Sequence, residues 1–147
     1  ERRYDEWQAY NQSKLANLLF TAELQRRLTA ADLPVASYAA HPGYASTNLQ
    51  HVAPEMTGSS LGKRFADFGN SVLAQSAEMG ALPTLYAATE PGLAPGSYVG
   101  PDGFMEQRGY PRVVVPNGAG RDMAMAARLW DRSEALIGVQ WSDAVHA

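Results

Sequence analysis

Tyr10 and Lys14 are the residues whose types and spacing best suit chemistry. On one α-helix, side chains four positions apart share a face, with Cβ atoms about 5–6 Å from each other. A free tyrosine is a poor acid or base at neutral pH, because it titrates at about pH 10. An ammonium group about 4 Å away, at an intermediate dielectric, stabilises a phenolate by about 4 kcal/mol, which suits general acid–base catalysis. We therefore expect Tyr10 to exchange a proton with a substrate hydroxyl or carbonyl, with Lys14 polarising it.

A long helix must carry this pair. Residues 5–31 have apolar side chains at helical spacing, and Pro34 ends the pattern because its ring cannot continue a helix. The apolar run at 35–40 predicts a strand buried on both faces, as parallel strands are, and His41-Pro42-Gly43 ends it. A long helix that leads into such a strand is half of a βαβ unit, so the sequence predicts an α/β fold.

The remaining elements follow from caps and turn residues. Ser76 predicts the start of a helix over 77–89, which contains Pro83, and Gly138 predicts the end of a helix over 122–136. Four residues suit the buried face of this last helix: Met123, Ala127, Trp130 and Leu136. Extended segments are expected at 97–100 and 113–115.

Residues 48–75 form a less regular stretch between the predicted strand and helix. They suit either a surface helix that covers the core or a substrate lid with an apolar underside. If the segment closes over a substrate, its apolar residues suggest a lipophilic one: Met56, Leu61, Phe65 and Phe68.

Two segments carry a resemblance to known enzymes. Tyr10–Asn17 is followed by a predicted strand that runs into His41–Leu49. Together they resemble the short-chain dehydrogenase/reductase family and, within it, the subgroup of retinol-dehydrogenase-like and protochlorophyllide-reductase-like enzymes. The resemblance continues through residues 78–81, 97–100 and 128–133, so it covers nearly the whole chain.

The resemblance implies roles for individual residues. Tyr10 matches the catalytic tyrosine, and Lys14 matches the lysine that binds the nicotinamide ribose and polarises that tyrosine. The implied reaction moves a hydride between NAD or NADP and an alcohol or carbonyl of a small-molecule substrate. The turn after the family's sixth strand meets the nicotinamide carboxamide, and Thr47 matches a hydroxyl that contacts the carboxamide or the pyrophosphate. The implied cofactor-binding residues are therefore Lys14, Pro42, Gly43, Tyr44 and Thr47.

The implied fold is the carboxyl-terminal half of a doubly wound parallel-sheet (Rossmann) domain, with residues 1–147 belonging to a single domain. In this fold, strands 35–40 and 97–100 should be parallel neighbours at one edge of the sheet. The family's Gly-rich phosphate loop and its Asn-Asn-Ala-Gly element have no match in the chain. The catalytic serine normally lies about a dozen residues before the tyrosine, in the family's own pattern, and the chain has only nine residues before Tyr10. We therefore expect the adenosine-binding half to lie outside this chain.

A homo-oligomer is also expected. In the family, the helix that bears the tyrosine commonly packs against its copy in a neighbouring subunit. In this chain the corresponding helix carries Ala16 and Phe20 beside its apolar stripe, which is more apolar surface than one contact face needs.

Composition excludes several classes of function. Twelve basic against fifteen acidic residues give a net charge of −3, so a nucleic-acid partner is not expected. The chain has no cysteine and three scattered histidines, so neither a disulfide nor a metal site is expected. No apolar run is long enough to span a membrane. We expect a cytoplasmic protein that acts on a small molecule.

Two alternatives stay open at this point. A sugar epimerase of the extended branch of the same superfamily also uses a tyrosine and a lysine at this spacing, and a product assay would distinguish it. A non-catalytic fragment would contribute packing or dimerisation alone, and mass spectrometry of the native gene product would reveal whether a front half exists.

The isolated 147 residues should bind neither NADH nor NADPH at concentrations below about millimolar, because they contain no phosphate loop to receive the pyrophosphate. Calorimetric titration of the purified chain measures this directly. Micromolar binding, together with a steep two-state unfolding transition, would contradict the prediction.

Overall fold

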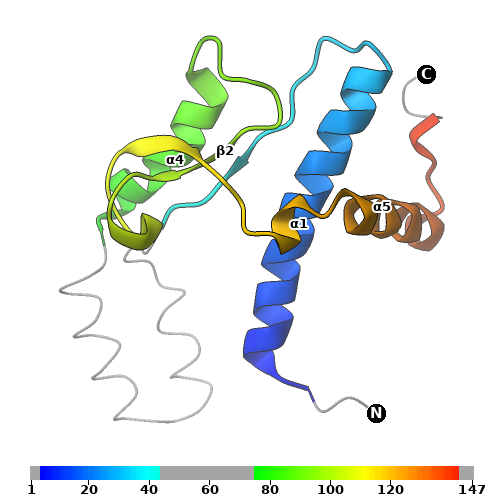
Figure 1. The fold of residues 1–147 in the computed structure, drawn as a ribbon, viewed down its shortest axis with the longest axis horizontal. Coiled ribbons are helices and arrows are strands. Elements are labelled where there is room, and N and C mark those ends of the chain that lie inside the picture. Colours follow the sequence, from blue (N-terminus) through cyan, green and yellow to red (C-terminus); the bar gives the residue numbers. More distant parts are fainter. Residues whose placement is uncertain (1–3, 44–74, 143–147) are drawn as a thin grey trace. The chain divides into compact units, whose positions relative to one another are not determined.

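The computed structural model describes residues 4–43 and 75–142 (Figure 1). The chain divides into two compact units. The first unit is built from Glu1–Ala39, Ala94–Ser97 and Val115–Ala147, and the second from Ala40–Leu93 and Tyr98–Val114. Apart from Gln75, the lid predicted at 48–75 lies outside the described residues.

The described elements are helices and strands, as the α/β prediction requires, and β2 and β3 follow one another with only a 3₁₀ turn between them. In chain order they are α1 (Glu6–Ala30), β1 (Ala39–Ala40), α4 (Ala77–Thr89), β2 (Tyr98–Pro101), the 3₁₀ turn η1 (Phe104–Glu106), β3 (Pro111–Val114), the 3₁₀ turn η2 (Ala119–Arg121) and α5 (Met123–Ile137).

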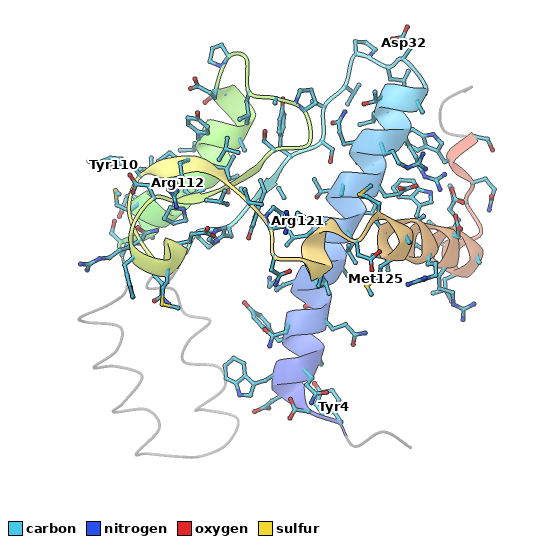
Figure 2. All side chains as sticks on the ribbon, in the orientation of Figure 1. Tyr4, Asp32, Tyr110, Arg112, Arg121 and Met125 are labelled. Atoms are coloured by element: carbon cyan, nitrogen blue, oxygen red, sulfur yellow. The ribbon has the colours of Figure 1, made fainter. Side chains whose placement is uncertain are left out.

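In the first unit, α1 confirms the predicted helix within one residue at each end. The Asp5 carboxylate accepts a hydrogen bond from the Gln8 N–H at 2.8 Å and caps the helix. Leu19 and Leu28 are buried on its core face. Tyr4 and Asp32, labelled in Figure 2, mark the two ends of the helix.

Helix α5 packs on α1 through aromatic side chains. The rings of Phe20 and Trp130 stack with centroids 5.3 Å apart and planes 11° from parallel. The Arg27 guanidinium lies 4.7 Å from the centre of the Trp130 ring. Part of the apolar surface that suggested a partner subunit is therefore used within this unit, although Phe20 stays 48% exposed.

The buried face of α5 differs from the prediction. Its fully buried residue is Ala126, and Trp130, four positions on, is half-buried. Met123 and Leu136 are exposed, at 42% and 69% of their surface, so their assignment to the core was wrong. The reason is geometric, because the stack on Phe20 fixes which stripe of α5 faces α1, and helical periodicity alone does not. Gly138 ends the helix in the left-handed conformation, at φ 70°, as predicted.

In the second unit, α4 packs against β2 and β3. Ser76 caps α4 and Pro83 lies inside it, both as predicted. β2 and β3 pair antiparallel, with Tyr98 opposite Val114 and Pro101 opposite Pro111. Val99 is completely buried at the centre of this pairing.

The sheet has the order β1-β2-β3. The Ala39 N–H donates to the Ser97 carbonyl and the His41 N–H to the Val99 carbonyl. Since the residue numbers rise together on both strands, β1 and β2 are parallel, as predicted. The carboxyl ends of both strands therefore reach the same edge of the sheet.

Strand β1 is shorter and more exposed than the predicted strand 35–40. It comprises Ala39–Ala40, and Val35 is 57% exposed, so the expectation of burial on both faces was wrong for this chain. The backbone of Ser37 instead bonds to groups outside a regular ladder. Its N–H donates to the Gln25 side chain at 2.8 Å, and its carbonyl accepts from the Gly96 N–H.

The turn after β1 packs tightly on the loop that follows β2. Gly43 has φ +66°, and a Cβ atom on it would collide with the Gln107 carbonyl and lie 2.8 Å from the Pro101 side chain. Glycine is therefore required here for two reasons, backbone conformation and lack of space.

Glu23 is a buried carboxylate that the sequence patterns did not reveal. Its side chain is 0% exposed and accepts hydrogen bonds from Arg26 at 2.6 and 2.8 Å and from Arg27 at 2.7 Å. The Arg26 guanidinium, followed by that of Arg27, holds the pKa of Glu23 below its usual value against the opposing effect of burial. Arg27 also reaches Asp131 of α5 at 3.4 Å, so the network connects α1 with α5.

Replacing Glu23 by Gln should destabilise the complete protein by about 1–3 kcal/mol at neutral pH, because two arginines lose charged acceptors. A lowered folded-state pKa gives stability that is present above the unfolded value of 4.5 and is lost as pH falls through the folded value. The difference between wild type and Glu23→Gln should therefore shrink in acid. Urea unfolding at a series of pH values measures it, and Glu90→Gln, at an exposed site, should change nothing. A difference that grew in acid would contradict this account.

Gly43→Ala should destabilise the second unit more than Gly92→Ala. Both glycines have positive φ, at +66° and +81°, so each alanine adds about 1–2 kcal/mol of backbone strain. No atom lies within 4 Å of a Cβ on Gly92, whereas a Cβ on Gly43 meets Gln107. Denaturant unfolding of the two variants compares them directly, and equal losses of free energy would show that the turn can move away without penalty.

Candidate functional site

Tyr10 and Lys14 lie together on an exposed face of α1. The Lys14 ammonium nitrogen is 5.2 Å from the centre of the Tyr10 ring. Tyr10 is 45% exposed, and the edge-to-face ring of Trp7 lies 6.4 Å from it on the preceding turn. The Ser13 hydroxyl donates to the Tyr10 carbonyl at 2.7 Å, so this serine side chain bonds to its own helix. The neighbourhood predicted from the spacing of the pair is thus present.

The Lys14 side chain is available for a ligand. Within residues 4–43 and 75–142, no carboxylate lies within ion-pair distance of its ammonium group. A compact ammonium group with three donors suits the vicinal hydroxyls of a ribose. The Tyr10 phenol on the same face can donate to or accept from a substrate oxygen.

His41 lies in the second unit, in the turn that its place before Pro42-Gly43 predicts. Its ring packs on Gly100, where a side chain would collide with it, and lies 5.1 Å from the ring of Tyr98. Nδ1 accepts from the Gly43 N–H at 3.3 Å, so in the neutral ring Nε2 carries the proton, 3.2 Å from the Glu106 carboxylate. Burial lowers the pKa of His41, and Glu106 opposes this effect without overcoming it. The lowered pKa favours the neutral ring, whose buried Nε2 has no hydrogen-bond partner among the described residues.

Gln75 is a second residue that the sequence patterns missed. It is 8% exposed. Its amide nitrogen donates to the Pro42 carbonyl at 2.6 Å, and its amide oxygen accepts from the Gly109 N–H at 3.0 Å. No local motif marks it, because both partners are more than thirty residues away in the chain.

The predicted site residues fall into three groups. Tyr10 and Lys14 lie in the first unit, Pro42 and Gly43 in the second, and Tyr44 and Thr47 lie outside the described residues. The structure brings together the members of the first pair and those of the second pair. Their union in one cofactor site stays a prediction.

Two features that the described residues lack bear on the kind of site. In the described part of the chain, no group of three or more histidine, aspartate or glutamate side chains is arranged to hold a metal ion. None of the described helices is both long and apolar enough to cross a membrane.

Comparison with known proteins identifies the family. No protein-family model matches the chain. The chain is 35% identical over 143 residues to retinol dehydrogenase 13 of Homo sapiens, covering 95% of this chain and 39% of the relative. It is 33% identical over 138 residues to short-chain dehydrogenase TIC 32 A, chloroplastic, of Brassica napus, covering 92% of this chain and 38% of the relative. A crystal structure of an uncharacterized protein from Mycobacterium paratuberculosis is 42% identical with a TM-score of 0.66, covering 96% of this chain and 42% of that one.

These matches extend over nearly the whole chain, but the chain spans about two fifths of the length of the curated relatives. The matched portion corresponds to their carboxyl-terminal half. The α/β architecture with a parallel strand pair agrees with part of a Rossmann-like domain. The chain is therefore a homologue of retinol dehydrogenases and other short-chain dehydrogenases, and it corresponds to their carboxyl-terminal half.

Proposed function

We propose that the complete protein transfers a hydride between NAD or NADP and an alcohol or carbonyl compound, with this chain supplying the Tyr10/Lys14 pair. The observation that carries the proposal is the Lys14 ammonium held over the Tyr10 ring on an exposed face of α1. The dehydrogenase names of the relatives favour this reaction over a sugar epimerase.

The residues present fit the nicotinamide-ribose end of such a cofactor. Lys14 has no carboxylate partner among the described residues and offers donors to the ribose hydroxyls. In the turn, the Gly43 N–H is bonded to His41 and the Pro42 carbonyl to Gln75. The proposal keeps Pro42 and Gly43 as the turn whose backbone meets the nicotinamide carboxamide. It keeps Thr47 as a hydroxyl that contacts the carboxamide or the pyrophosphate, and Tyr44 as a further cofactor-binding residue. When bound, the nicotinamide ring supplies or accepts the hydride.

The proton follows a separate path through Tyr10. During reduction of a carbonyl, the Tyr10 hydroxyl donates its proton to the substrate oxygen, which becomes the alcohol hydroxyl. During oxidation, the phenolate oxygen of Tyr10 accepts the proton of the alcohol. Lys14 stabilises that phenolate through its positive charge, which the low polarity of a closed site strengthens.

The proposal also covers the substrate class, the oligomeric state and the cellular location of the complete protein. Relatives named retinol dehydrogenases support a lipophilic alcohol or carbonyl as the substrate. A homo-oligomer of the complete protein remains proposed, with less free surface on α1 than its sequence indicated, because Phe20 stacks on Trp130. The cytoplasmic location remains a prediction from the cysteine-free composition.

Tyr10→Phe in the complete protein should reduce kcat by about 10²- to 10⁴-fold, because one positioned acid–base group is lost, while leaving the Kd for NADH or NADPH nearly unchanged. Lys14→Ala should impair both kcat and cofactor affinity, and Lys14→Arg should rescue little, since a planar fork does not replace a compact ammonium. Steady-state kinetics and cofactor fluorescence titration measure these effects.

The matched control is Tyr86→Phe on α4, which removes a hydroxyl from a helix of the second unit. Its activity should equal that of the wild type. Retention of more than about half of the activity by Tyr10→Phe would refute the assignment of the general acid–base residue.

A further inference from the structure

The turn at 41–43 is held by a loop that follows β2, at the edge of the sheet where both parallel strands end. This support loop comprises residues 102–110 and leads from β2 into β3. Figure 2 labels Tyr110 and Arg112 where the loop joins β3. Ligands of open α/β sheets bind outside the carboxyl ends of the strands, so any shape imposed on this edge bears on ligand binding.

The support loop has a fixed internal structure. The Asp102 N–H donates to the Tyr110 carbonyl, and the Tyr110 N–H donates to the Asp102 carboxylate, both at 2.8 Å. Met105 and Glu106 have positive φ values of 51° and 56°, which add about 1–2 kcal/mol of strain each in residues other than glycine. Such strain persists where surrounding contacts over-determine the backbone, and it is concentrated at functional sites.

Three contacts connect this loop with the turn. Gly43 packs against the Gln107 carbonyl, and the His41 ring nitrogen lies 3.2 Å from the Glu106 carboxylate. The third contact is Gln75, whose amide joins the Pro42 carbonyl to the Gly109 N–H. It is the one connection of the three in which a side chain bonds the backbone on both sides.

The chemistry of Gln75 indicates more than space filling. Burying a primary amide is unfavourable unless its donor and acceptor are both satisfied, and a leucine could fill a similar volume without this requirement. The amide does what leucine could not, since it fixes the direction of the Pro42 carbonyl and hence the orientation of the next peptide group. That peptide leads into Gly43, the residue from which the chain continues to Tyr44.

We propose that Gln75 is a positioning residue of the cofactor site, which holds the turn at Pro42–Gly43 in the shape that receives the nicotinamide. The proposal rests on the proposed function. Gln75 acts through the turn and touches no reacting atom. Its loss should loosen the turn and weaken cofactor binding, with little effect on the chemical step once the cofactor is bound.

The test uses the complete protein with Gln75→Leu, Gln75→Glu and Gln75→Met. Gln75→Glu keeps the volume and the acceptor for the Gly109 N–H but replaces the donor to the Pro42 carbonyl with a carboxylate oxygen. Each variant should raise the Kd for NADH or NADPH, measured by fluorescence titration, by about tenfold or more, because small misplacements of a binding group are costly. The KM for the cofactor should rise in parallel, while kcat at saturating cofactor stays within about threefold of the wild type.

Gln25→Leu is the matched control. Both ends of the Gln25 amide are also hydrogen-bonded: its oxygen accepts from the Ser37 N–H at 2.8 Å, and its nitrogen donates to Thr29 of the same helix at 3.0 Å. It belongs to the first unit, whereas the turn belongs to the second. Gln25→Leu should lower the Tm as a structural loss does, and it should leave the Kd for the cofactor within about twofold.

The outcomes separate the two proposals. If the wild type binds and turns over NADH or NADPH but the Gln75 variants bind it within about twofold of the wild type, the positioning role is overturned and the proposed function stands. If the wild type neither binds nor uses either cofactor, both are overturned. If Gln75→Leu fails to fold, the near-isosteric Gln75→Glu decides by the same titration.

Discussion

Backbone hydrogen bonding along both edges of β2 is the constraint on which the second unit depends. β1 occupies one edge in parallel and β3 the other in antiparallel orientation. With both edges paired, β2 buries Val99 completely and leaves no room for a side chain at Gly100, where the ring of His41 packs. The parallel edge also brings the turn at 41–43 to the same end of the sheet as the loop at 102–110. The tight contact at Gly43 and the two bonds of Gln75 both follow from this pairing.

In the first unit, the two parts of α1 differ in their contacts: the carboxyl-terminal part packs on α5, and the amino-terminal part carries the candidate catalytic pair. The carboxyl-terminal part of α1 carries the buried Glu23, its two arginines and the stack of Phe20 on Trp130, which together hold α5. The amino-terminal part carries Tyr10 and Lys14 on a face that stays exposed. Backbone hydrogen bonds fix each turn of this 25-residue helix relative to the next. Packing at its carboxyl-terminal part therefore also holds Tyr10 and Lys14 in place.

Some of the exposed residues in the described part of the chain are large and apolar. Trp7 on α1 and Val35 before β1 are 65% and 57% exposed. The chain spans about two fifths of the relatives it matches, and a parallel strand is ordinarily covered on both faces. Segment 35–40 has the composition of an interior strand, but within it only Ala39–Ala40 form a strand, β1, which lies at an edge of the described sheet.

The sequence by itself determined the features that depend on neighbours within one turn or one cap. The bounds of α1, the cap at Ser76, the stop at Gly138 and the shared face of Tyr10 and Lys14 all follow from local spacing. The parallel pairing of β1 with β2 followed from the doubly wound fold that the family resemblance implies. The family resemblance added candidate roles for residues 42–47, which the local patterns could not supply.

The tertiary structure decided which residues distant in sequence meet. Gln75 bonds to residues 33 and 34 positions away, and His41 packs on Gly100, so no local period could have marked either. Glu23 occupies a position that looks like the polar face of a helix, and it is buried because two arginines neutralise it there. Met123 and Leu136 have the composition of a core face but are exposed, because the stack of Trp130 on Phe20 fixes the rotation of α5. Periodicity specifies that a helix has an apolar face, whereas contacts with other segments determine which residues that face buries.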